Sequence, residues 1–149
     1  MGDRPTALKK FCQFYNALSM SRNHPRLYYS RTLKEAMLGK SEYTKGLFNQ
    51  FVKEYKKIGT VSVEPSKTMI AIATEKRGIA YVTQLGKNFI HIVFVFRIPY
   101  TDNLCFQKIV QAYGKDRFNH HCRIFFKEDI NSEVRKFMKL AYQGEDIEA

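Results

Sequence analysis

Three short runs of apolar residues, separated by two turn signals, occupy the middle of the chain. The runs are residues 69–74, 79–85 and 89–97, and they are rich in β-branched and aromatic side chains. Glycine and polar residues at 76–78 and 86–88 separate them. Because short loops join antiparallel neighbours, the pattern predicts a three-stranded antiparallel meander.

The third run is apolar at positions of both parities, so that both faces of a strand built from it would be apolar. A strand of this kind is usually central in its sheet and covered on both sides. We therefore expect this run to lie at the centre of the sheet. One face carries Ile90, Ile92, Phe94 and Phe96, and the other carries Phe89, Val93 and Val95.

Two helical patterns precede the predicted sheet. Thr32 and Glu35 have the spacing of a capping box, and Gly39 stops the short helix that they begin. Ser41 is the predicted cap of a longer helix that ends at Gly59. Apolar residues recur on one side of this longer helix, which predicts that it packs against the sheet.

Further strands and a last helix flank the meander. We expect a strand at residues 60–63, ended by Pro65, and another strand at 121–126. Residues 105–113 could form a helix or an edge strand, and we favour the strand because their apolar positions fit neither period well. Asp129 or Asn131 caps the final helix. The helix buries one apolar stripe, which consists of Ile130, Val134, Phe137, Met138 and Ala141.

These elements predict one α+β domain, with a mainly antiparallel sheet of about five to six strands. An N-terminal helical segment and a C-terminal helix pack on the sheet. The domain covers residues 32–144, between a basic segment at 1–31 and an acidic tail at 145–149. In the basic segment, four apolar residues have helical spacing and predict a short docking helix: Phe11, Phe14, Tyr15 and Leu18.

The net charge of +11 is concentrated in the first part of the chain. Residues 1–60 carry 12 Lys and Arg against 4 Asp and Glu, a net +8, whereas the remaining 89 residues carry 13 against 10, a net +3. This asymmetry favours a polyanionic partner: nucleic acid, an anionic membrane surface or an acidic protein. A charged surface that only keeps the protein in solution is the alternative.

Two sets of basic residues are candidates for contacts with nucleic acid. Arginines and tyrosines that alternate in the N-terminal segment could neutralise phosphates and stack on bases, although the tyrosines could equally pack on the domain. Lysines also lie on the polar face of the longer helix, as they do on many solvent-exposed helices. The candidates are Arg22, Arg26, Tyr28, Tyr29, Arg31, Lys53, Lys56 and Lys57.

A small anion pocket is a further candidate site. Neighbouring residues of a strand point to opposite faces, so His121 and Arg123 share a face that His120 does not. Lys67, just before a central strand, would complete an anion pocket if it lay beside them. Structural roles are the alternative for each: hydrogen bonds at the sheet rim for the histidines, and an ion pair with a carboxylate for Lys67. We interpret His91 as an interior histidine whose hydrogen bonds are satisfied.

Signals for catalysis, metal binding and membrane insertion are lacking. The sequence has no GxSxG, P-loop, HExxH or glycine-rich dinucleotide motif, and we assign no catalytic residue, metal ligand or cofactor. No apolar run reaches the ~20 residues of a membrane span. The three cysteines form no CxxC pair, which favours a reducing cytoplasm over a disulfide framework.

Several short segments, in the order in which they occur, resemble a known family. They are residues 58–59, 61–65, 67–70, 80–82, the pair His120 and His121 with Arg123, and residues 128–131 and 141–142. Together they resemble the small bacterial domain-of-unknown-function family numbered fifty-six fifty-five, over residues 32–144. The resemblance implies a fold pattern but no mechanism, because this family has no established activity.

The resemblance also affects whether we expect a zinc site and a nucleic-acid partner. Some family members carry a zinc-ribbon segment in front of the domain, and residues 21–24 look like a relic of it. The cysteine pairs are absent here, so no zinc site is expected. Related domains occur beside nuclease-like modules, which favours nucleic acid as the partner. The leading hypothesis is therefore a noncatalytic module that binds nucleic acid or another polyanion, and the alternatives are a protein-interaction or homodimerisation module and the small anion pocket.

Overall fold

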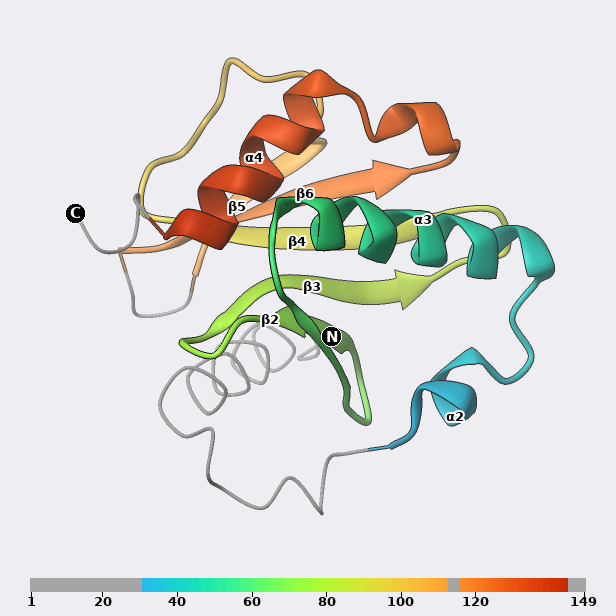
Figure 1. The fold of residues 1–149 in the computed structure, drawn as a ribbon. Coiled ribbons are helices and arrows are strands. Elements are labelled where there is room, and N and C mark those ends of the chain that lie inside the picture. The colour runs from blue at the N-terminus through green and yellow to red at the C-terminus, as the bar shows by residue number, and fades with distance from the viewer. Residues whose placement is uncertain (1–30, 113–115, 145–149) are drawn as a thin grey trace, which may run out of the picture.

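Six antiparallel strands form one sheet, in the order β1-β2-β3-β4-β6-β5 (Figure 1). The computed structural model describes residues 31–112 and 116–144. Together with the helices, the sheet makes a single α+β domain, which confirms the predicted fold class. The strands are β1 (Ser62–Pro65), β2 (Ile70–Ala73), β3 (Gly78–Leu85), β4 (Ile90–Phe96), β5 (Lys108–Gln111) and β6 (Phe118–Ile124).

The predicted meander is formed by β2, β3 and β4. Strand β4 lies between β3 and β6, and six of its seven residues are buried. Its side chains alternate between the two faces, so that Ile92 and Phe94 belong to one buried cluster and Val93 and Val95 to another. The strand with two apolar faces is thus central in the sheet and buried on both faces.

Three helices complete the described part of the chain, together with a 3₁₀ turn at Lys127–Asp129. They are α2 (Leu33–Met37), α3 (Glu42–Ile58) and α4 (Ser132–Gln143). Helices α3 and α4 lie side by side on one face of the sheet (Figure 1). Their apolar stripes and this face of the sheet form the larger of the two buried clusters.

The caps of these helices agree with the sequence. Thr32 and Glu35 form the capping box of α2, and Ser41 caps α3. Of the two candidates for the last helix, Asn131 is the cap, since its side chain accepts a hydrogen bond from the backbone of Val134. Helix α4 ends at Gly144, which has a left-handed φ of 71° that disfavours residues with a Cβ.

Three strands have other bounds than predicted. The strand expected at 105–113 is an edge strand but covers only Lys108–Gln111. The first strand is not 60–63 but Ser62–Pro65, and it includes Pro65, which an edge strand tolerates because the missing N–H faces no partner. The last strand is not 121–126: it begins at Phe118 and ends at Ile124. Asp129 accepts hydrogen bonds from the backbone N–H groups of Phe125 and Phe126. These N–H groups therefore do not pair with a neighbouring strand, and β6 ends before them.

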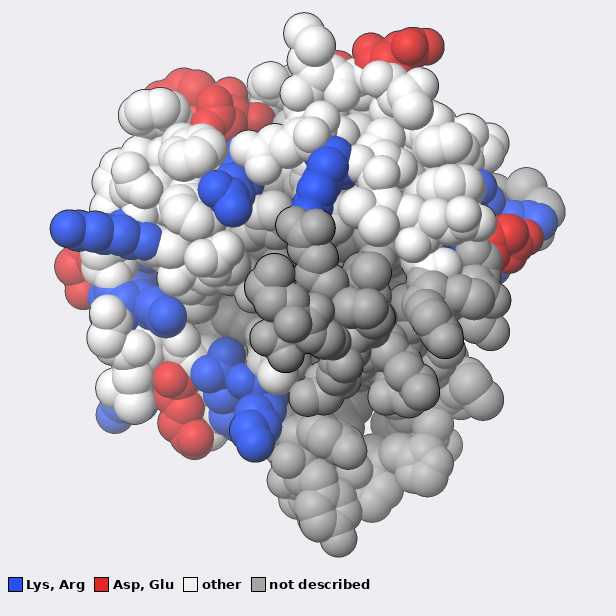
Figure 2. Space-filling model, turned by 180° about the vertical axis from the view of Figure 1, so that it is seen from behind, with Lys and Arg blue, Asp and Glu red and all other residues white. Residues whose placement is uncertain are grey.

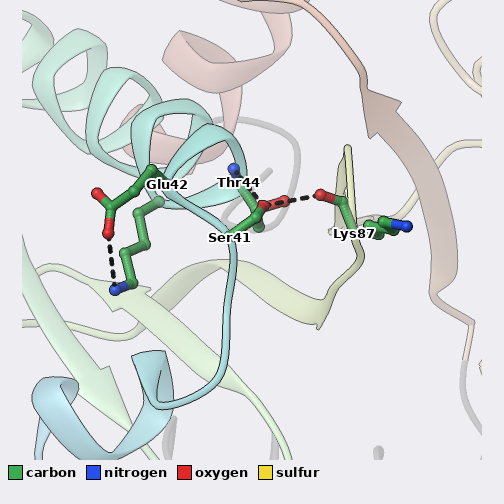
Figure 3. A network of polar contacts seen from close by, with 5 residues as sticks. Ser41, Glu42, Thr44 and Lys87 are labelled. Atoms are coloured by element: carbon green, nitrogen blue, oxygen red, sulfur yellow. Dashed lines mark hydrogen bonds and ion pairs between the residues drawn. The ribbon is translucent and has the colours of Figure 1, made fainter.

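Polar contacts fix the start of α3 against the turn between β3 and β4 (Figure 3). The Ser41 hydroxyl accepts from the Thr44 backbone at 3.1 Å and donates to the carbonyl of Lys87 at 2.8 Å. The buried Thr44 hydroxyl donates to the carbonyl of Gly86 at 2.6 Å. Tyr43 donates to the carbonyl of Phe125 after β6. The helix is thus held to both sides of β4.

We expect Thr44→Val to lower the free energy of unfolding by about 1–3 kcal/mol. Valine keeps the shape of threonine but leaves the partly buried carbonyl of Gly86 without this donor. Urea denaturation measures the change. Thr68→Val is the matched control, because Thr68 is exposed and the same substitution there should change stability by less than about 0.5 kcal/mol. Equal effects at the two positions would contradict the assigned role of the Thr44 hydroxyl.

Candidate polyanion-binding surface

Six exposed cations lie on the outer sides of α3 and α4, facing away from the sheet. The helices bury their apolar stripes, so the lysines and arginine at the remaining positions are directed to solvent. We call this set the cationic helix face. It consists of Lys53, Lys56 and Lys57 on α3 and Arg135, Lys136 and Lys139 on α4.

The sequence identified only half of the cationic helix face. Lys53, Lys56 and Lys57 were predicted as contacts, but Arg135, Lys136 and Lys139 were not. The signal for the second half is the helical spacing of three cations within five residues of an amphipathic helix. Whether that helix lies beside α3 is a matter of tertiary structure, which local spacing does not specify.

Contacts between the two helices set their relative position. The buried Tyr55 hydroxyl donates to the backbone carbonyl of Met138 at 3.1 Å. Beside it, Arg135 contacts the carboxylate of Glu54 at 3.3 Å. Lys57 contacts the same carboxylate at 3.5 Å. The cations of α3 and α4 therefore form one surface.

Glu54 is the only acidic residue from Lys45 to the end of α3, and α4 has none after Glu133. Its carboxylate is only 9% exposed. Burial alone would raise the pKa of Glu54, but the hydrogen bond from Arg135 and the charges of Lys57 and Arg135 outweigh it, so that the pKa lies below its ordinary value. Glu54 is therefore ionised at neutral pH and offsets one of the six positive charges.

Of the other predicted nucleic-acid contacts, the structure describes only Arg31. Arg22, Arg26, Tyr28 and Tyr29 lie outside the described residues. Arg31 lines a groove together with Lys40 and Thr68, near the start of α3, whereas the three lysines lie in the last turns of this helix.

Basic residues are distributed differently on the opposite side of the domain. Figure 2 shows the molecule from behind, where the Lys and Arg side chains lie in several separate groups among uncharged residues. Some of these groups lie next to Asp or Glu side chains.

His121 and Arg123 project from the same face of β6, as predicted, and His91 of β4 lies between them. The Arg123 Nε–H donates to Nδ1 of His91 at 3.1 Å. His91 must then carry its proton on Nε2, which lies 2.8 Å from Nδ1 of His121 and donates to it. The proton of neutral His121 is consequently on Nε2, a buried nitrogen that has no hydrogen-bond partner among the described residues.

Both histidines of this chain of hydrogen bonds are neutral at pH 7. Burial lowers the pKa of His91 to about 4, and the charges of Arg123 and Lys108 add to the effect. Burial likewise lowers the pKa of His121 to about 4, with contributions from His91, Lys108 and His120. His91 is half-buried and hydrogen-bonded on both nitrogens, in agreement with its interpretation as a satisfied interior histidine.

His120 points to the opposite face from His121, as strand alternation requires. It is fully buried, and its ring packs between Phe96 and Phe106. Its Nε2 accepts from the backbone of Tyr100 at 3.1 Å, and its Nδ1 therefore donates to the carbonyl of Phe118 at 2.9 Å. His120 is a structural residue of the core.

Lys67 does not meet His121 and Arg123. It lies in the turn between β1 and β2, and β3 and β4 separate β2 from β6. At ~4.8 Å between neighbouring strands, three spacings place Lys67 about 14 Å from the strand that carries the other two residues. Lys67 instead adjoins Thr68, which lines the same groove as Arg31.

Two kinds of reactive site can be checked among the described residues, a cysteine nucleophile and a metal site. Cys122 is buried on the face opposite His121, and burial raises the pKa of its thiol to about 12, so it is not a thiolate at neutral pH. No group of three or more His, Cys, Asp or Glu residues in the described ranges is placed to hold a metal ion.

Comparisons with known proteins do not assign this α+β domain to a family. No family model, curated protein or solved structure matches the chain. The resemblance to the bacterial family of unknown function therefore stays a prediction. Within residues 31–112 and 116–144, none of the helices has the length and apolar character needed to cross a membrane.

The free energy of unfolding should fall as the pH is lowered from about 6.5 to 4. The histidines take up protons near pH 6.5 in the unfolded chain but only near pH 4 in the folded one, so acid favours unfolding. We expect the pair to contribute about 1–2 kcal/mol, less than the full linkage value because both rings are partly solvated. Urea denaturation at pH 7 and pH 5 measures this loss.

The variant His91→Gln/His121→Gln tests the origin of this pH dependence. Glutamine can form hydrogen bonds but does not titrate, so the variant should lose less stability between pH 7 and pH 5 than the unmodified protein. An unchanged loss would assign the acid sensitivity to other groups.

Proposed function

We propose that this protein is a noncatalytic module that binds nucleic acid through the cationic helix face. The observation that carries the proposal is the gathering of six exposed cations on two adjacent helices, with Glu54 as the one acidic residue among them. Such a surface attracts phosphates and gains free energy from the release of their counterions. The overall charge of +11 would increase the rate of encounter with a polyanion.

The chemistry of this surface favours contacts with the phosphate backbone over recognition of bases. Lysine, which provides five of the six cations, binds phosphate as a flexible point charge. The aromatic side chain beside these cations, Tyr142 of α4, is half-buried against the core and against Gly59 at the end of α3, so it offers little surface on which an unpaired base could stack. Duplex nucleic acid, bound with little sequence preference, is therefore the expected ligand of this surface.

The first test is the salt dependence of binding to a labelled DNA duplex, measured by fluorescence anisotropy. The variant Lys53→Gln/Lys56→Gln/Lys57→Gln should weaken binding at low salt by about tenfold or more. It should also reduce the slope of log K against log salt by about 1 for each lysine that contacts a phosphate.

The matched control is Lys67→Gln/Lys76→Gln/Lys87→Gln. These lysines are exposed in the turns between β-strands, and the control removes the same charge outside the cationic helix face. A control that weakens binding as much as the helix variant would show that only net charge matters. Absence of binding at low salt would exclude the proposed function.

A second test uses the acidic residue of the surface. Glu54→Gln should tighten duplex binding by about two- to fivefold at low salt, because it removes a negative charge and releases Arg135 and Lys57 for phosphate contacts. The same anisotropy titration measures this effect. Weaker binding by the variant would instead indicate that Glu54 is needed to hold Arg135 in place.

A further inference from the structure

The sheet has a second buried cluster on the face turned away from α3 and α4. Val93 and Val95 alternate along β4 with Ile92 and Phe94, which face the helices. The members of the cluster are at most 7% exposed. They are Met69, Ala71, Tyr81, Val93 and Val95.

None of the described helices covers this second cluster. Ala36 of α2 and the apolar stripes of α3 and α4 all belong to the cluster on the opposite face. Burial of apolar surface is the main favourable contribution to folding, so an apolar sheet face of this kind requires a covering layer. The described strands and helices do not provide that layer.

The described chain begins at the edge of this face. Arg31 lines a groove whose lining includes Met69 of the second cluster as well as Ile70 and Val82 of the first, so the groove lies where the two faces of the sheet meet. The 30 residues that precede Arg31 in the sequence therefore join the domain at the edge of the face that no described helix covers.

The sequence of these residues suits the face. Phe11, Phe14, Tyr15 and Leu18 follow the spacing i, i+3, i+4 and i+7, which gives one apolar stripe over two turns of helix, about 11 Å long. The strands that carry the cluster, β2 to β4, span about 10 Å at ~4.8 Å between neighbours. The 13 residues from Leu18 to Arg31 can reach about 40 Å when extended, which is more than enough to cross the sheet.

We propose that residues 1–30 cover the second cluster with the stripe of Phe11, Phe14, Tyr15 and Leu18. The N-terminal segment then adds a third layer, and β4 is enclosed between helices on both sides. This assigns the segment a structural role that is independent of the proposed binding of nucleic acid by α3 and α4.

The test uses the full chain. Phe14→Asp/Leu18→Asp places charges on the stripe, and Gln13→Asp/Asn16→Asp places the same number of charges on the opposite side of the predicted helix. We expect only the stripe variant to shift the methyl NMR signals of Ala71, Val93 and Val95. The same variant should increase the fluorescence of a dye that binds apolar surface several-fold and lower the urea midpoint by about 1 M. Phe14→Ala is the milder variant for the same measurements if the charged one does not fold.

Two results would overturn the proposal. One is that the methyl signals of Val93 and Val95 are the same in the stripe variant, the control variant and the unmodified protein. The other is a stable dimer in sedimentation whose dissociation on dilution changes these signals, since a second copy of the chain would then cover the face. Loss of duplex binding is not expected in either variant, so the outcome is separate from that of the proposed function.

Discussion

The burial of β4 on both faces is the constraint on which the rest of the structure depends. A strand with apolar side chains on both sides can be central only if each side of the sheet is covered. On one side, α3 and α4 provide the cover, and their apolar stripes fix which way each helix is turned. The opposite stripes, which carry the cations, are therefore turned to solvent.

Buried polar contacts make this arrangement specific. Thr44 joins α3 to the turn after β3, and Tyr55 joins α3 to the backbone of α4. Each contact gives a buried hydroxyl its acceptor, so sliding of a helix along the sheet would break hydrogen bonds as well as apolar contacts. The two helices that carry the six cations are thus held in place, and Glu54 contacts two of these cations, Arg135 and Lys57.

The neighbouring histidines show how strand alternation separates structural and functional candidates. His120 is enclosed by aromatic rings and has both nitrogens hydrogen-bonded within the core. His121 belongs to the other face, where it ends the chain of hydrogen bonds from Arg123 through His91. In this chain, Arg123 uses its Nε to orient His91, and its guanidinium also lies 4.6 Å from the ring of Phe89.

The sequence by itself determined the local elements of this protein. The capping box of Thr32, the cap of Ser41 and the alternation of β4 depend on residues a few positions apart, and short-range sterics and hydrogen bonds decide them. The order of the strands in the sheet was not determined by such local signals. The pairing of β6 with β4 joins segments some 30 residues apart. It brings His91 to His121, whereas β3 and β4 lie between β6 and the strand that follows Lys67. The packing of α4 beside α3, which completes the cationic helix face, joins segments some 80 residues apart. Only the tertiary structure decided these, because such contacts depend on how the whole core fills its volume, which no local spacing specifies.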